Sequence, residues 1–406
     1  MLGKRNDLIL FYLFEFEQNV RNTVNLYIQN IQPGDKTKGR FSLFSFSVHQ
    51  IIDMKRIVKQ VVGIDVAQKE LVVSLGRMYD DWTPELYAGK SFANTQKGFE
   101  KLMQWVNKQM DEFVCIGYVM EATGVYHEPL AYFLDEKSQQ ISIILPNKMS
   151  NYMRTLDVKT ITDKTASEAI AKFGLERKLD LWKKPKEIYR SMKQLTRERD
   201  QIVEERSMVK NHLHAEESEA YPNKSSIERI NERIRMLNKQ EKAIKNEIAA
   251  LIASEKEVKG LVEKMTSIPG IGDLTAAIIL AETNGFELIR NKRQLASYAG
   301  FDVKEKSSGT SVKGKARISK KGNRHLRKAM HLPAFSAIKY DERFKAIYAR
   351  IVAKQGIKMK GAVAVQRKLL EMCYTIYKTN DLYDREYLKK REQKGTVVDL
   401  NQESGQ

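Results

Sequence analysis

Three carboxylates stand where the sequence predicts that a buried element begins or ends. Asp65 lies in the apolar run 61–67, whose β-branched residues predict a buried strand. Glu121 follows the apolar run 113–120, and Asp163 precedes a helical pattern. A buried carboxylate is costly as an anion unless a cation meets it, and its hard oxygens suit Mg²⁺. The three acids are therefore candidate metal ligands; the structural alternatives are a turn at Asp65 and a helix cap at Asp163.

The segments around these acids alternate between strand and helix patterns. Besides the two apolar runs, strands are expected at 70–75, 91–94 and 141–145, and helices at 98–110, 128–134 and 166–173. The short turn after Asp65 favours an antiparallel hairpin, and the order that follows is that of a ribonuclease H-like sheet. Carboxylates converging on such a sheet can hold two Mg²⁺ ions about 4 Å apart, which clamp a phosphodiester during in-line displacement.

The chain is strongly basic, with 70 Lys and Arg against 51 Asp and Glu and a net charge of +19. This excess favours a polyanionic partner, most often nucleic acid.

Cys115 and Cys373 lie in apolar surroundings and are predicted to be buried free thiols, which suits a reducing cytosol. The apolar run 8–14 is too short to span a membrane, so no membrane partner is expected.

Changes in composition divide the chain into five segments. They are an N-terminal extension of doubtful role (1–56), the acid-bearing domain (57–180), a charged helical linker (186–260), a small C-terminal domain (261–385) and a polar tail (386–406). The run from Met54 leads straight into the Asp65 strand, which favours Met54 as the natural start. The N-terminal mass of the natively expressed protein tests this hypothesis.

The linker carries an apolar seam between charged flanks. Ile188, Leu195, Ile202 and Val209 recur every seven residues, and after a turn at 220–223 the apolar residues follow a three–four spacing interrupted only by Glu241. This spacing is typical of a coiled coil. We expect a projecting hairpin that also dimerises; the alternative is a spacer packed on its own domain.

The C-terminal domain combines a glycine-rich turn with a serine beside many cations. The string 266–274 resembles a helix-hairpin-helix, in which Gly270 and Gly272 let backbone amides approach a DNA phosphate. Ser308 lies in a polar loop and could attack a phosphodiester, with nearby cations stabilising the charge; a loop that only binds phosphate is the alternative. The cations after the serine are Lys313, Lys315, Arg317, Lys320, Lys321, Arg324, Arg327 and Lys328.

Together these strings resemble the insertion-sequence transposases of the IS-one-ten type, with the IS-eleven-eleven subgroup, also called DEDD or bridge-RNA-guided recombinases. The match runs in family order over about residues 60 to 380. The matching strings are Gly63-Ile64-Asp65-Val66, Met120-Glu121-Ala122-Thr123-Gly124, Thr162-Asp163-Lys164, Ile170-Ala171, Ile268-Pro269-Gly270-Ile271-Gly272, Tyr298-Ala299-Gly300-Phe301, Ser308-Gly309 and 318–327.

The resemblance implies an α/β plus α architecture: a RuvC-like domain, a coiled-coil linker and a small, mainly helical transposase-20-type domain. It also implies that Asp65, Glu121 and Asp163 bind Mg²⁺ and that Ser308 is the nucleophile. Family members act as dimers or tetramers, in which acids and serine from different subunits form a composite centre. They use a structured guide RNA to pair with donor and target DNA, here in a bacterial cytoplasm.

The sequence departs from the family at one acid. The family has a fourth acid three residues after the third, where this chain has Ala166. Glu168 is the favoured substitute, although it points about 200° from the Ala166 direction on a helix. A site with three acids and an impaired enzyme are the alternatives. Two other functions stay open: a RuvC-like structure-selective endonuclease that uses water, and an inactive nucleic-acid-binding relative.

Overall fold

The computed structural model describes residues 55–122, 124–156, 160, 162–304, 307–308, 312–313 and 317–386. The backbone alone is described at 307–308 and 312–313. The chain separates into two compact units, Met1–Lys184 and Pro185–Gln406, which we call the sheet unit and the helical unit. The N-terminal extension up to residue 54 and the polar tail from 387 lie outside the described residues.

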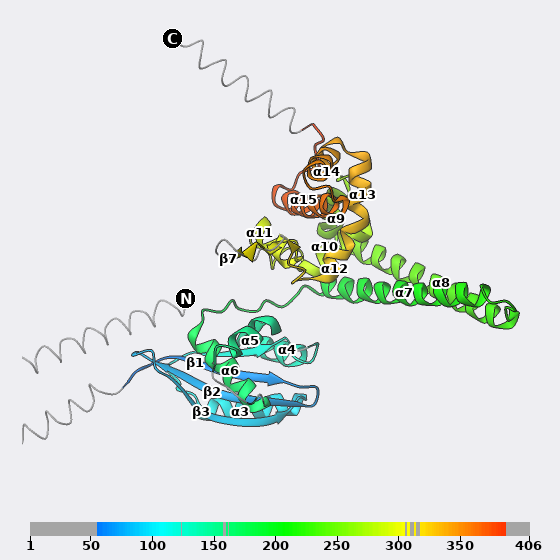
Figure 1. Ribbon diagram of the computed structural model, residues 1–406. Helices are drawn as coiled ribbons and strands as arrows, with labels where there is room; N and C mark the ends of the chain where they lie inside the picture. Colours follow the sequence, from blue (N-terminus) through cyan, green and yellow to red (C-terminus); the bar gives the residue numbers. More distant parts are fainter. Residues whose placement is uncertain are drawn as a thin grey trace, which may run out of the picture. The chain divides into compact units, whose positions relative to one another are not determined.

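The sheet unit is built on five strands in the order β3-β2-β1-β4-β5 (Figure 1). Strands β1, β2 and β3 pair antiparallel, whereas β4 and β5 continue the sheet parallel to β1. This mixed topology confirms the predicted ribonuclease H-like sheet. The strands are β1 (Ile57–Val66), β2 (Glu70–Tyr79), β3 (Pro84–Ala93), β4 (Ile116–Glu121) and β5 (Gln140–Ile144).

Helices cover both faces of this sheet because the side chains of a strand alternate between its faces. Val62 and Ile64 of β1 pack with α3 and α4, and Val61 packs with α5 and α6. The four helices are α3 (Gln96–Gln109), α4 (Glu128–Glu136), α5 (Pro146–Met153) and α6 (Asp163–Glu176).

The second acid-bearing strand begins later than the apolar pattern predicts. Strand β4 starts at Ile116, and the residues before it form a surface turn in which Phe113 is 97% exposed. Cys115 lies in this turn and is exposed, so the prediction of a buried thiol there is wrong; Cys373 is buried as expected. The apolar run therefore placed the start of the strand too early, because its first residues lie outside the sheet.

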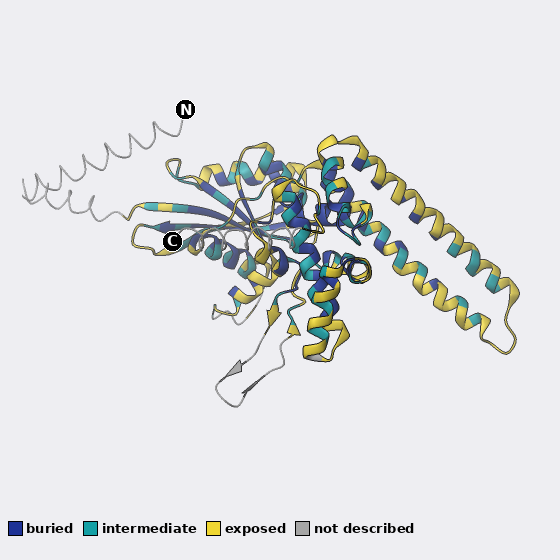
Figure 2. Cartoon of the chain, turned by 90° about the horizontal axis from the view of Figure 1, so that it is seen from above, coloured by how far each residue is buried: buried dark blue, intermediate teal, exposed yellow. Residues whose placement is uncertain are grey.

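The helical unit begins with two long helices, α7 (Glu187–Glu217) and α8 (Lys224–Ser254), joined by a turn and lying side by side (Figures 1 and 2). Glu241, the polar interruption of the seam, is buried between them and forms ion pairs with Arg199 and Arg206 of α7 and with Lys245. These contacts fix the register of the hairpin. Supercoiling and dimerisation stay predictions.

The rest of the helical unit packs around α10 and α15 in one apolar core. Its helices are α9 (Lys256–Thr266), α10 (Asp273–Thr283), α11 (Lys292–Tyr298), α12 (Arg324–Ala329), α13 (His331–Tyr340), α14 (Glu342–Gln355) and α15 (Lys358–Thr379). Two short antiparallel ladders pair β6 (Val303–Lys304) with β9 (Arg317–Ile318) and β7 (Ser307–Ser308) with β8 (Val312–Lys313). In the described part of the chain, no helix is long and apolar enough to cross a membrane.

Candidate functional site

Asp65 and Glu121 stand next to each other at one end of the sheet. Asp65 is the last residue but one of β1, and Glu121 is the last residue of β4. Because Ile64 pairs with Met120, the two acids occupy the next position of the same ladder. By strand alternation, Asp65 shares the face of Val61, and Glu121 that of Val119, which is the face that α6 covers.

Helix α6 brings the third acid to the same end, and Gly63 makes its close approach possible. A Cβ atom at Gly63 would lie 2.3 Å from the backbone nitrogen of Ala171 and 2.5 Å from the carbonyl oxygen of Ser167. Only glycine therefore lets α6 lie this close to β1. Ser167 anchors the same contact through a hydrogen bond between its Oγ and that of Ser74, 2.8 Å long.

Asp163 is the first residue of α6, but it is not the residue that caps the helix. The cap is Thr162, whose side chain accepts a hydrogen bond from the backbone nitrogen of Thr165. The Thr165 hydroxyl in turn accepts one from the backbone nitrogen of Thr162, which completes a capping box. Thr162 and not Asp163 therefore caps α6, and capping does not explain the carboxylate of Asp163.

The charges of Asp163 and Glu121 act on the carboxylate of Asp65. Burial of Asp65 raises its pKa most, the negative charges of Asp163 and Glu121 raise it further, and the result is about 6 against an ordinary 3.8. A hydrogen bond from the Val66 backbone opposes this rise only in part. A partly buried acid whose neighbours are also acids is a place where a cation would be strongly stabilised.

Glu168, the expected fourth ligand, lies on a different side of α6. It follows Asp163 by five residues, which places it about 140° around the helix from that residue. It is half-buried and is not among the charges that shift the pKa of Asp65. Ala166 lies nearer, about 60° from Asp163 on the other side. The structure therefore brings Asp65, Glu121 and Asp163 together but leaves Glu168 apart from them.

We call Asp65, Glu121 and Asp163 the acidic edge. Their carboxylate oxygens fit a hard divalent cation such as Mg²⁺. The three side chains lie farther apart than direct ligation of one ion requires. Within the described residues, no group of three His, Cys, Asp or Glu side chains is close enough to hold a metal ion. The fit is thus one of charge and ligand type, and the three acids would have to draw closer to share an ion.

Ser308 lies in the helical unit, on the second residue of strand β7. Its backbone pairs with Val312 of β8, so it forms part of a short hairpin. Its side chain and that of Lys313 lie outside the described residues, as does the whole of Lys315. The hairpin follows Phe301 and precedes the cationic segment that the sequence singled out.

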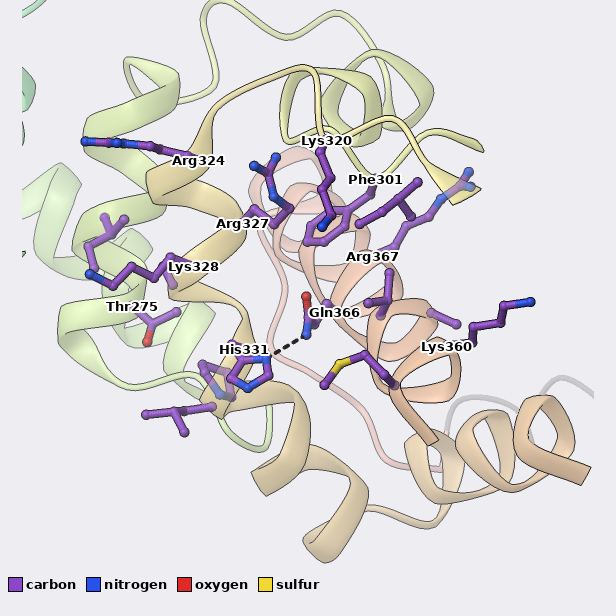
Figure 3. Close-up of a pocket in the computed structure, with 18 of the residues that line it drawn as sticks. Thr275, Phe301, Lys320, Arg324, Arg327, Lys328, His331, Lys360, Gln366 and Arg367 are labelled. Atoms are coloured by element: carbon purple, nitrogen blue, oxygen red, sulfur yellow. Dashed lines mark hydrogen bonds between the residues drawn. The ribbon is translucent and has the colours of Figure 1, made fainter. Parts of the chain in front are cut away.

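A large groove opens in the helical unit beside that segment (Figure 3). Its volume is about 1370 Å³, and residues of α7, α10, α12, α13 and α15 line it together with β9. Apolar side chains such as Leu274, Phe301 and Val363 form much of its wall. Asp200 is the one carboxylate among its described lining residues, and the cations are Arg199, Arg317, Lys320, Arg324, Arg327, Lys328, Lys360 and Arg367.

Sequence reasoning found part of this groove and missed the rest. Five of the predicted cations line it, namely Arg317, Lys320, Arg324, Arg327 and Lys328, whereas Lys321 does not. Arg199, Lys360 and Arg367 were missed because they come from α7 and α15, far from the serine in the chain. No local signal marks them, since each is one cation on a generally charged helix.

Several groove cations already have partners inside the protein. Arg327 donates to the carbonyl oxygen of Ala299 at 2.8 Å, and Lys328 lies 2.9 Å from a Glu204 oxygen and 3.6 Å from an Asp200 oxygen. The ring Nδ1 of His325 is 3.4 Å from the other Asp200 oxygen. Arg324 is exposed and forms no ion pair within the described part of the chain. The groove therefore mixes cations that are neutralised with cations that are available.

A buried carboxylate holds the start of α12 in place. Glu282 of α10 is 2% exposed and receives two hydrogen bonds from Arg197 of α7, at 2.9 and 3.1 Å. The side chain of Asn323, which caps α12, donates to it at 2.6 Å. Burial alone would raise the pKa of Glu282, but these hydrogen bonds outweigh burial and hold that pKa below its ordinary value.

The glycine-rich turn divides into a packing glycine and an open one. Gly270 has a φ of +93°, and a Cβ there would lie 2.4 Å from the carbonyl oxygen of Pro333 on α13. Gly272 is the N-cap residue of α10, and a Cβ atom there would have no heavy atom within 4 Å. Gly270 thus allows close helix packing, and the space beside Gly272 is open; that either glycine contacts a phosphate stays a prediction.

Comparisons with known proteins agree with this arrangement. A family described as "Transposase" matches residues 62–222, and the "Transposase IS116/IS110/IS902 family" matches residues 262–349. The pilin gene-inverting proteins of Moraxella bovis and Moraxella lacunata are 26% and 25% identical to the chain over 329 residues, which are 80% of this chain and 98% of each of those proteins. A 43.6 kDa protein of insertion element IS110 from Streptomyces coelicolor is 30% identical over 148 residues, 36% of this chain and 35% of that protein.

Among solved structures, RuvC of Thermus thermophilus in complex with a Holliday junction substrate matches 30% of this chain and 99% of its own. The identity is 9% and the TM-score 0.24, so the fold assignment rests on the strand order above and not on this match.

The class that the sheet topology and the family matches define is that of enzymes that cut and rejoin DNA. Within that class, the chain belongs to the IS110 family of transposases.

Proposed function

We propose that this transposase cuts DNA through the Ser308 hydroxyl while its acidic edge holds Mg²⁺, and that a structured RNA guides it. The observation that carries the proposal is the convergence of Asp65, Glu121 and Asp163, with the pKa of Asp65 raised to about 6. The negative charges of Asp163 and Glu121 disfavour ionised Asp65, so binding of a divalent ion beside it would be favourable. An ion held there would stabilise negative charge that develops on the phosphate.

The proposed reaction consists of two balanced transesterifications. The Ser308 oxygen bonds to phosphorus and gives up its proton, while the bond from phosphorus to one deoxyribose oxygen breaks and that oxygen takes a proton. The strand is then joined to the protein as a phosphoserine ester. A deoxyribose hydroxyl of another strand reverses these steps and releases the serine, so no outside energy source is needed.

The groove of the helical unit supports the same proposal through charge. It offers eight cationic side chains against one carboxylate among its described lining residues, beside the hairpin that carries Ser308. Such a site suits the phosphate backbone, and cations near the serine would stabilise the additional charge on phosphorus. Lys313, Lys315 and Lys321 belong to the same proposed set, although they lie outside the described residues or off the groove.

The guide RNA, the cytoplasmic location and the assembly into dimers or tetramers are proposed on the family resemblance. In that arrangement, the acidic edge of one subunit serves Ser308 of another. Glu168 remains the candidate for the fourth ligand, with less support than the other three acids because it lies apart from them. The N-terminal extension carries no part of this proposal.

The test is to trap the covalent intermediate. The full chain is purified from cells that carry the whole element, the RNA that copurifies is sequenced, and a labelled DNA matching that RNA is incubated with protein and Mg²⁺. Denaturing electrophoresis should show label attached to the wild-type protein and to Ser307→Ala, the matched neighbour, but not to Ser308→Ala. If Ser308→Ala still cleaves and no variant forms an adduct, water is the nucleophile and the endonuclease alternative holds. If DNA is bound equally well in EDTA and never cleaved, the chain is an inactive relative.

A further inference from the structure

A second groove lies in the sheet unit, along the edge strand β3 and helix α3. Its volume is about 530 Å³, and it is lined by four lysines, Lys90, Lys97, Lys101 and Lys108, with no Asp or Glu among its described lining residues. All four lysines are exposed, and none forms an ion pair within the described part of the chain. We call this feature the lysine groove; it is separate from the acidic edge and from the groove of the helical unit.

Three of the lysines form a stripe along one side of α3. Lys97 and Lys101 are one turn apart, and Lys108 follows two turns later, so the stripe spans about 16 Å along the helix axis. The buried residues Phe99, Leu102 and Val106 occupy the opposite side and pack against the sheet. The stripe is therefore held rigid and straight, with a length close to half a turn of B-form DNA, about 17 Å.

The lysine groove begins at the same end of the sheet as the acidic edge. Asp65 pairs with Val72 of β2, and Val72 pairs with Ser91 of β3, so Ser91 lies two strands from Asp65, about 10 Å away. Helix α3 starts just after β3 and runs back from this end. Because α3 and α6 cover opposite faces, a path from Asp65 to Lys97 passes over the end of the sheet.

Protection of an open sheet edge does not explain the stripe. Lysine on an edge strand discourages pairing with another chain, and this accounts for Lys90 on β3. Lys97, Lys101 and Lys108 are on the helix and have no edge to protect. Trp105, which packs on Phe92 with ring centroids 5.6 Å apart, and Gln104 complete the wall between these lysines. A carboxylate-free groove with an aromatic wall fits a phosphate backbone better than an uncharged partner.

We propose that the lysine groove binds the backbone of the DNA that flanks the position served by the acidic edge. The inference deepens the proposed function and rests on it for one point, namely that the polyanion at the acidic edge is DNA. Lys97 would take the phosphates nearest that edge, and Lys101 and Lys108 those farther along. These contacts read no base sequence and would hold the flanking DNA in line with the site.

The test compares two alanine triples in the full chain. One replaces Lys97, Lys101 and Lys108; the matched control replaces Lys148, Lys239 and Lys242, exposed helical lysines away from the groove. Alanine favours helix, so both should fold, which thermal melting checks. Binding of a labelled random-sequence DNA duplex is measured in EDTA across a salt series, so that no cleavage occurs. A Lys-to-Arg triple in the groove serves as the conservative variant.

The proposal predicts that the groove triple binds at least about tenfold more weakly and that its salt slope falls by up to about 2.7, which is 0.9 for each lost phosphate contact. The arginine triple should keep the wild-type salt slope, and the control triple should change the slope less than the groove triple does. Equal slopes for the groove and control triples would overturn the proposal. So would a loss seen only with an RNA duplex or with polyglutamate. The binding assay in EDTA involves neither metal nor cleavage, so a failure of the cleavage mechanism leaves this result standing.

Discussion

The acidic edge and the groove of the helical unit carry opposite charge, and they differ in how far the protein itself balances that charge. The acids at the sheet have only one another as charged neighbours in the shift of Asp65. The cations of the groove are met by Asp200, Glu204 and the Ala299 carbonyl. A cation from outside would therefore stabilise ionised Asp65, whereas the partly balanced groove can keep its shape until DNA arrives.

The largest effect should come from removing a charge at the acidic edge. Asp65→Asn is expected to lower the rate of DNA cleavage by at least about 10²–10³-fold, because a ligand to the catalytic cation is lost. Single-turnover cleavage of a labelled substrate measures it. Glu168→Gln is the matched comparison and should lose much less activity, since Glu168 lies apart from the other acids. Equal losses would mean that Glu168 moves in to become the fourth ligand.

The unbalanced charge at Asp65 should also show in stability against pH. A carboxyl whose folded pKa is about 6 binds a proton more tightly than in the unfolded chain, where the value is 3.8. Between pH 4 and 6 the folded state thus holds more protons, and its stability falls as pH rises, by up to about 3 kcal/mol. Thermal melting without divalent ions should show this fall in wild type and a smaller one in Asp65→Asn. A pH response unchanged by the substitution would mean that Asp65 is not in this environment.

The smallest effects should separate two cations of the groove. Arg324→Ala should weaken DNA binding by about 1 kcal/mol and reduce the salt slope by about 0.9, because Arg324 has no ion pair in the described chain. Lys328→Ala should change both less, since Asp200 and Glu204 already neutralise it. Fluorescence anisotropy over a salt series measures both variants. If the two variants lose the same affinity and salt slope, the ion pairs of Lys328 do not reduce its contact with DNA, and the contrast between the two regions is weaker.

Much of the sheet unit could be predicted from the sequence because its signals are local. Apolar runs with β-branched residues indicated the strands, and acids at or near their ends pointed to one end of the sheet. The exceptions have physical reasons. Phe113 and Cys115 are apolar but precede the sheet, and the cap of α6 is Thr162 and not Asp163. The role of Gly63 depends on how closely α6 approaches, which no local pattern states.

The helical unit was harder to predict because its groove collects residues from distant elements. Lys360 and Arg367 come more than 150 residues after Arg199 in the sequence, yet all three line one groove. The support of α12 by Glu282 and Arg197 likewise depends on packing between α7 and α10. Gly270 matches a phosphate-binding motif by its sequence, and its close packing against α13 could not be read from that motif. Such features are set by tertiary contacts and leave little trace in a local pattern.

Asp65, Glu121 and Asp163 converge on one end of the sheet, where burial and the two other acids raise the pKa of Asp65, and we propose that they bind a divalent cation there. Titration calorimetry of the full chain with Mg²⁺ at a pH above 7, where Asp65 is ionised, tests it most directly. We expect saturable Mg²⁺ binding to the wild type, binding that persists in Glu168→Gln, and loss of binding in Asp65→Asn. Identical heats for wild type and Asp65→Asn would show that Asp65 does not bind the ion.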